Sequence, residues 1–289
     1  MSAHHLTKAG ALLGLGAFFC YSTSDAFSRK LMLAGVSQQQ VLASLMIVAL
    51  LPLLTVVSFK KAWAQLVPQR PAFVALIVLA ACVEAYFCFY AFGHLTYLVE
   101  AYALFFTMPL WTALLAAILL KEKLSRFQIG AILAGFAGVI LANWPQEGMS
   151  PLGYAHFAGL MAPFLASLRI LAMRKLGQQD GGYSLLFLLF LTVAAVNFAS
   201  IPAYVSVSGS LLAYLLIAGL AQGMGYTCFL LAAQRTAAGL VAPFQYSQII
   251  WALLYGIALF GEWPKANTYI GLVLVIAGGA LLLKKPKPA

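Results

Sequence analysis

Ten apolar runs, each about 20 residues long, make up most of this chain. A helix needs about 20 mostly apolar residues to cross the ~30 Å hydrocarbon core of a bilayer. Membrane barrel strands alternate over only ~10 residues, so these runs are too long for strands. The sequence predicts an all-α membrane protein with ten transmembrane helices, at approximately 8–28, 39–59, 72–92, 98–120, 126–143, 151–172, 183–204, 210–233, 239–260 and 267–283.

Composition supports a membrane rather than an aqueous environment. The chain has 289 residues, of which 63% are hydrophobic and 8% are charged. Soluble domains are usually about a quarter charged. The connections between the apolar runs are short, so we expect no separate soluble domain.

Two segments that are far apart in the chain end alike. When Phe105–Leu124 is aligned with Gln245–Trp263, Trp111 falls on Trp251 and Glu122 falls on Glu262. A helix rich in small residues follows each segment. These patterns predict five spans in residues 1–147 and five more in residues 148–289. An odd number of spans inverts the second copy, and inverted repeats around a central cavity are typical of secondary transporters.

The distribution of cations predicts the orientation. If the N-terminus is cytoplasmic, 14 of the 17 Lys and Arg residues lie on the cytoplasmic side, and Arg29, Lys30 and Lys265 lie on the other side. Cationic loops stay in the cytoplasm. We therefore expect both termini inside, in a multi-pass protein of a bacterial inner membrane. The basic charges are spread over short loops, which argues against nucleic-acid binding.

Motifs of several other functional classes are missing from the sequence. It has no Walker loop, no GxSxG or HExxH motif and no potassium-filter sequence. The four cysteines lie in apolar runs and form no CxxC pattern. We expect a protein that is not an enzyme and has no cofactor, no metal and no disulfide framework.

Ionisable residues inside the spans are candidates for function, because a charge in lipid is costly. Glu84 is the deepest, and we expect it to be either protonated or paired. Asp25 and Glu100 lie nearer the outer interface. Arg169 could reach the cytoplasmic surface or pair with a carboxylate. These four are the candidates for coupling or for an ion pair. We expect Glu262, like Glu122, to be an interfacial helix end or the partner of a neighbouring lysine.

Aromatic and amide side chains form a second set of candidates. Gln245 and Gln248 are three residues apart, so they share a helix face. An amide facing lipid would lose its hydrogen bonds, so this face should point inward. Pro109 and Pro243 would kink their helices. The predicted substrate-binding or cavity-lining residues are Glu84, Tyr86, Tyr90, Tyr102, Trp111, Gln222, Tyr226, Gln245, Tyr246, Gln248 and Trp251.

The repeated halves, the Glu that ends the fourth span and the Gly-rich fifth span resemble the EamA-type branch of the drug/metabolite transporter superfamily. Within it, Val83–Ala116 looks most like the YddG-type aromatic amino acid exporters, on the strength of Glu84, Glu100 and Pro109. Met108 departs from that pattern, in which Trp precedes the proline.

The resemblance implies an inner-membrane exporter of aromatic amino acids and related compounds. It would work by alternating access, as a monomer in membrane lipid. The alternatives are an exporter of another metabolite, such as an aliphatic amino acid or a nucleoside, and, outside this class, a lipid scramblase or a membrane enzyme.

Overall fold

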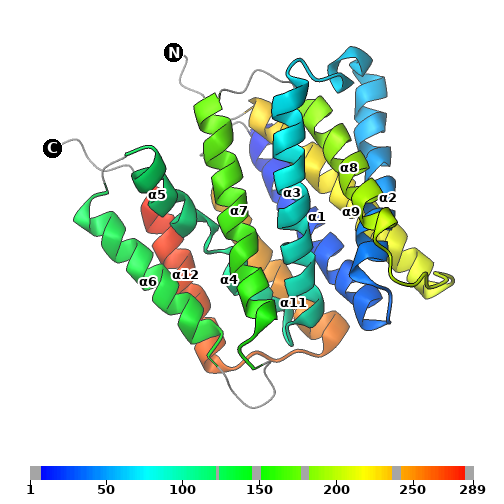
Figure 1. Ribbon diagram of the computed structural model, residues 1–289. Coiled ribbons are helices and arrows are strands. Elements are labelled where there is room, and N and C mark those ends of the chain that lie inside the picture. Colours follow the sequence, from blue (N-terminus) through cyan, green and yellow to red (C-terminus); the bar gives the residue numbers. More distant parts are fainter. Residues whose placement is uncertain (1–7, 122–123, 145–150, 177–181, 236–241, 284–289) are drawn as a thin grey trace. The chain divides into compact units, whose positions relative to one another are not determined.

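The computed structural model describes residues 8–121, 124–144, 151–176, 182–235 and 242–283 (Figure 1). Within these ranges the elements are α-helices and two short 3₁₀ helices, and there is no strand. The all-helical fold is therefore confirmed for this part of the chain. Glu122 and the predicted repeat boundary between residues 147 and 148 lie outside the described residues.

The helices coincide with the predicted apolar runs over most of their length. The first half of the chain forms α1 (Lys8–Leu33), α2 (Gln38–Phe59), the 3₁₀ helix η1 (Trp63–Leu66), α3 (Pro71–His94), α4 (Leu98–Phe105), α5 (Met108–Leu119) and α6 (Arg126–Ala142). The second half forms α7 (Tyr154–Leu176), α8 (Gly182–Ala199), α9 (Ser210–Arg235), the 3₁₀ helix η2 (Ala242–Tyr246), α11 (Ser247–Phe260) and α12 (Ala266–Leu283).

Six helical stretches of the described chain are long and apolar enough to cross a membrane. They are Gln38–Phe59, Pro71–His94, Leu98–Leu119, Tyr154–Leu171, Gly182–Ala199 and Ser210–Ala232. Shorter apolar helices cover Arg126–Ala142, Phe244–Phe260 and Ala266–Gly279. α1 has 26 residues, but its second half carries Asp25, Arg29 and several serines, which make it less apolar. These features indicate a multi-pass membrane protein.

The predicted span 98–120 is interrupted between α4 and α5. Pro109 lies in the first turn of α5 and has no N–H with which to continue the helical hydrogen bonds. The Thr107 hydroxyl donates to the Leu104 carbonyl at 2.6 Å, which closes the end of α4. Pro243 likewise lies in η2, just before α11. Both prolines therefore mark irregularities in their helices, as the sequence predicted.

The chain divides into two compact units, and each contains helices from both predicted repeats. Unit 1 comprises Met1–Cys82 and Gln179–Tyr255. Within it, α9 packs against α1 and α2, and α2 packs against α8. Gly219 allows α9 to approach α2 closely, because a Cβ there would lie 2.5 Å from the Cβ of Val48.

Unit 2 comprises Val83–Gln178 and Gly256–Ala289. Within it, α7 packs against α4 and α5, and α6 packs along α12 (Figure 1). The backbones of α6 and α12 meet at glycines: a Cβ on Gly138 would lie 2.7 Å from the Gly271 oxygen. Small residues allow such close approach in membranes. The two small-residue helices thus pack on each other.

Candidate functional site

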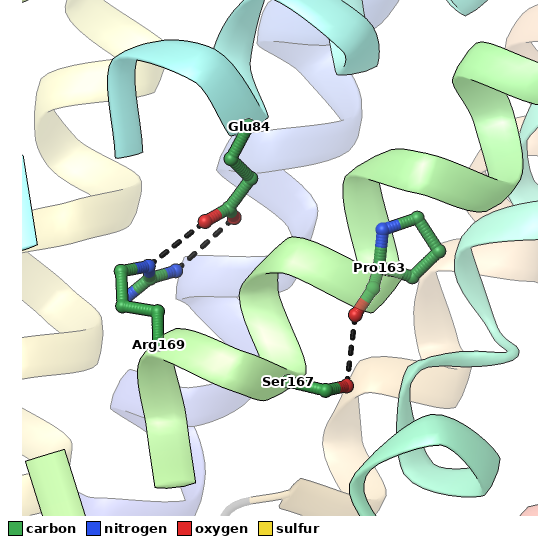
Figure 2. Close-up of polar contacts among 4 residues, drawn as sticks. All are labelled: Glu84, Pro163, Ser167 and Arg169. Atoms are coloured by element: carbon green, nitrogen blue, oxygen red, sulfur yellow. Dashed lines mark hydrogen bonds and ion pairs between the residues drawn. The ribbon is translucent and has the colours of Figure 1, made fainter. Parts of the chain in front are cut away.

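Glu84 of α3 and Arg169 of α7 form a two-point ion pair in unit 2 (Figure 2). Arg169 Nε donates to Glu84 Oε2 at 2.8 Å, and Arg169 Nη2 donates to Glu84 Oε1 at 3.1 Å. The parallel donors of a guanidinium match the two oxygens of a carboxylate. The sequence left open whether Glu84 is protonated or paired, and the structure contains the paired form.

Aromatic side chains follow the ion pair along the same two helices. The α3–α7 aromatic cluster consists of Tyr86, Phe87 and Tyr90 from α3 with Tyr154 and Phe157 from α7. The ring centroids of Tyr90 and Tyr154 are 4.8 Å apart in a T-shaped arrangement. Phe87 and Phe157 are 6.0 Å apart, also edge to face. Sequence analysis named Tyr86 and Tyr90 as candidates and missed the two residues from α7. Their three-residue spacing at the start of a predicted span was the available signal.

The other candidates of unit 2 lie in tighter packing. Tyr102 is 2% exposed and contacts the rings of Phe92, Phe105 and Phe106. Trp111 is half-buried and meets Phe136 and Phe164 edge to face. Glu100 is fully buried in the first turn of α4, where a carboxylate interacts favourably with the helix dipole.

Glu262 has a partner that is distant in sequence. The expectation of an interfacial helix end or a pair with a lysine stays a prediction. The side chain is 7% exposed, and its Oε2 accepts a hydrogen bond from the backbone N–H of Leu98 at 2.8 Å. Leu98 is the first residue of α4, where N–H groups have no partner within the helix. Glu262 therefore caps a helix that is distant in sequence.

Asp25 is buried in α1 of unit 1, at 9% exposure. Arg29 was expected in an outer connection, but α1 continues to Leu33 and Arg29 is 3% exposed. The two residues are four apart, so they share one face of α1. The four-residue spacing from Asp25 was the sequence signal that Arg29 belongs to the helix. The predicted apolar run ended before Arg29. Three further polar residues of this half of α1 are fully buried: Ser22, Ser24 and Ser28.

The remaining candidates of unit 1 lie on α9, η2 and α11. Tyr226 contacts Tyr21 and Phe190, and Trp251 contacts Phe19 with ring centroids 4.9 Å apart. Gln222 and Gln248 are buried, whereas Gln245 and Tyr246 are half-buried. Gln245 lies in η2 and Gln248 in the first turn of α11, which follows η2 directly, so their shared inward face stays a prediction. A 3₁₀ turn is a common start of an α-helix, and Pro243 favours it here.

The structure thus gathers the candidates into two groups, one within each unit. The predicted central cavity draws on both groups and stays a prediction.

Comparison with known proteins identifies the family. The model of the EamA-like transporter family matches the chain twice, over residues 8–144 and 153–284. A riboflavin transporter of Vibrio cholerae is 23% identical over 98% of this chain and 95% of its own length. The pseudopaline exporter of Pseudomonas aeruginosa is 26% identical over 98% of each chain.

A further relative is an uncharacterized transporter of Helicobacter pylori. It is 28% identical over 60% of this chain, and the match spans 61% of its own length. A solved crystal structure has the same fold, with a TM-score of 0.66 at 18% identity, covering 94% of this chain and 95% of that one. Because the two family matches together cover nearly all of the sequence, this chain belongs to the EamA-like transporter family.

Proposed function

We propose that this protein transports small molecules and exports aromatic amino acids across a bacterial inner membrane by alternating access. The observation that carries the aromatic preference is the α3–α7 aromatic cluster beside the Glu84–Arg169 pair. Rings that meet edge to face offer π-faces and edges to a further ring. Binding sites for small molecules are mostly apolar, with a few polar groups that fix the ligand.

Ten spans in two inverted repeats fit the contacts within the two units. In unit 1, Trp251 meets Phe19 of α1, and Tyr255 shares a hydrogen bond with Thr23 of the same helix at 2.7 Å. In unit 2, Trp111 meets Phe164 of α7, and Thr112 donates to Ser167 of that helix at 2.9 Å. Spans four and nine would then contact spans six and one in equivalent ways, as inverted copies should.

The second candidate is an exporter of another small metabolite. The names of the relatives favour it, because they refer to riboflavin and to pseudopaline rather than to amino acids. Membership of the family supports transport, but the residues of each chain determine which substrate it carries.

Transport by the purified protein in sealed liposomes tests both candidates. We expect uptake of labelled phenylalanine, tyrosine and tryptophan that exceeds uptake of leucine, uridine and riboflavin. Protein-free liposomes are the control. Preferential transport of leucine, uridine or riboflavin would select the second candidate. Lipid flipping without solute transport would reject both.

A further inference from the structure

The Glu84–Arg169 pair is partly exposed, although it joins the middle of one apolar helix to another. The side chains of Glu84 and Arg169 are 22% and 25% exposed. The nearby polar contact between α5 and α7 differs, because its central residue Ser167 is fully buried. The carboxylate and the guanidinium thus keep part of their surface uncovered, which a binding site requires and a purely structural contact does not.

The two charges of the pair cancel. An ion inside a bilayer needs a partner, because removing one member of a buried pair leaves an uncompensated charge. A cation that binds Glu84 would displace Arg169 and break both bonds of the pair. An anion that binds Arg169 would do the same to Glu84. A ligand that carries both charges satisfies both residues at once.

We propose that Glu84 and Arg169 form a zwitterion-binding site, in which the ligand's ammonium replaces Arg169 on Glu84 while its carboxylate replaces Glu84 on Arg169. The empty site stays neutral through the direct pair, and the occupied site stays neutral through two new pairs. Only hydrogen bonds and ion pairs are exchanged. A guanidinium binds a carboxylate through two parallel bonds, in the geometry that it already has with Glu84.

This inference deepens the proposed function and rests on it, since it names the charge class of the transported compound. The aromatic cluster would decide which side chain is accepted, and the ion pair would require an ammonium and a carboxylate on the same ligand. Phe87, three residues after Glu84, lies on the same side of α3 and contacts the rings of Tyr154 and Phe157, so the ion pair and the aromatic cluster both join α3 to α7.

The test compares ligands that differ only in charge. The probes are L-phenylalanine, L-phenylalaninamide and 3-phenylpropanoate, with L-leucine, L-leucinamide and 4-methylpentanoate as a second series. Measurements at about pH 6 keep the amides cationic, because an α-amino group has a pKa near 8. Relative affinities come from the ligand dependence of the thermal unfolding temperature of the purified full chain.

In the wild type, we expect each zwitterion to bind at least about tenfold more tightly than its cationic and anionic analogues, because each analogue forms only one of the two new pairs. Glu84→Gln should shift the preference toward the carboxylates, and Arg169→Gln should shift it toward the amides. The double substitution keeps neutrality and should abolish the charge preference. Lys60→Gln is the matched control, because it removes a cation that contacts Tyr183 at 3.1 Å in unit 1.

Opposite shifts in the two single variants support the inference. A wild type that binds all three charge forms equally, or fails to bind either series, overturns it. Equal losses for every ligand in both variants also overturn it and leave the pair as a structural contact. If leucine and phenylalanine show the same charge ranking and equal affinity, the zwitterion site stands and the aromatic preference of the proposed function fails.

Discussion

The carboxylate of Glu262 caps α4 by accepting a hydrogen bond from the backbone N–H of Leu98, a residue 164 positions earlier in the chain. Both groups lie in unit 2 and are buried. An N–H at a helix start has no partner within the helix, and a negative charge there also interacts favourably with the helix dipole.

Replacement of Glu262 should therefore destabilise the protein. Glu262→Ala leaves the Leu98 N–H without this acceptor, which should cost about 1–2 kcal/mol. Glu262→Gln keeps an acceptor oxygen and should cost less. The measurement is the apparent unfolding temperature in detergent, followed by intrinsic fluorescence. Equal unfolding temperatures for the wild type and the Ala variant would contradict a capping role.

The contact between α6 and α12 should not tolerate a larger residue at Gly138. A Cβ there would approach backbone atoms of α12, at 2.7 Å from the Gly271 oxygen and 2.9 Å from the Val275 nitrogen. Gly138→Ala should lower the unfolding temperature. Gly130 provides the control in the same helix, because a Cβ there meets nothing within 4 Å. Gly130→Ala should be neutral or stabilising by up to ~1 kcal/mol, since Ala is the better helix former. Equal effects at both positions would argue against the close packing.

Gln40 should hold the connection between α8 and α9. It is 1% exposed, its Nε2 donates to the Val205 oxygen at 2.6 Å, and its Oε1 accepts from the Val205 N–H at 2.9 Å. Gln40→Ala removes both bonds and should cost about 2–3 kcal/mol. Gln40→Glu keeps the acceptor but places a carboxylate against the Val205 oxygen, so it should also destabilise. Limited proteolysis should show faster cleavage within residues 200–209 in both variants. Unchanged cleavage rates would show that the side chain is not needed there.

Local sequence features predicted the helices well, because each apolar run is a property of consecutive residues. Pro109 and Pro243 predicted the irregularities for the same reason, since a missing N–H acts within one turn. The end of α1 was misjudged because a buried Arg29 looks like a loop cation when apolar length alone is considered. The four-residue spacing of Arg29 from Asp25 indicated more reliably that Arg29 lies in the helix.

Long-range partners were harder to predict. The hydrogen bond between Leu98 and Glu262 joins residues that are 164 positions apart, whereas a neighbouring lysine is visible in the local sequence. Arg169 was identified as a possible partner of a carboxylate, but its spacing could not select Glu84 over the other acids. Tyr154 and Phe157 were not selected from the sequence, and aromatic residues at the start of a span are typical of the interfacial belt. Only the folded arrangement of α3 and α7 relates them to Tyr90 and Phe87.

Tyr154 gives the sharpest test of the aromatic cluster, because sequence analysis did not select it. Its ring contacts Phe87, Tyr90 and Phe157, and the residue is 49% exposed. If the cluster binds the ring of the substrate, Tyr154→Ala should raise the KM for phenylalanine roughly 2- to 10-fold, which corresponds to one aromatic contact. Tyr154→Phe retains the ring and should stay close to the wild type. The control is Tyr204→Ala in unit 1, which removes a ring that is 73% exposed and lies outside the cluster. Initial rates of phenylalanine uptake into liposomes, measured over a range of concentrations, separate KM from the maximal rate. If all three variants have the wild-type KM, the aromatic substrate does not bind at this cluster.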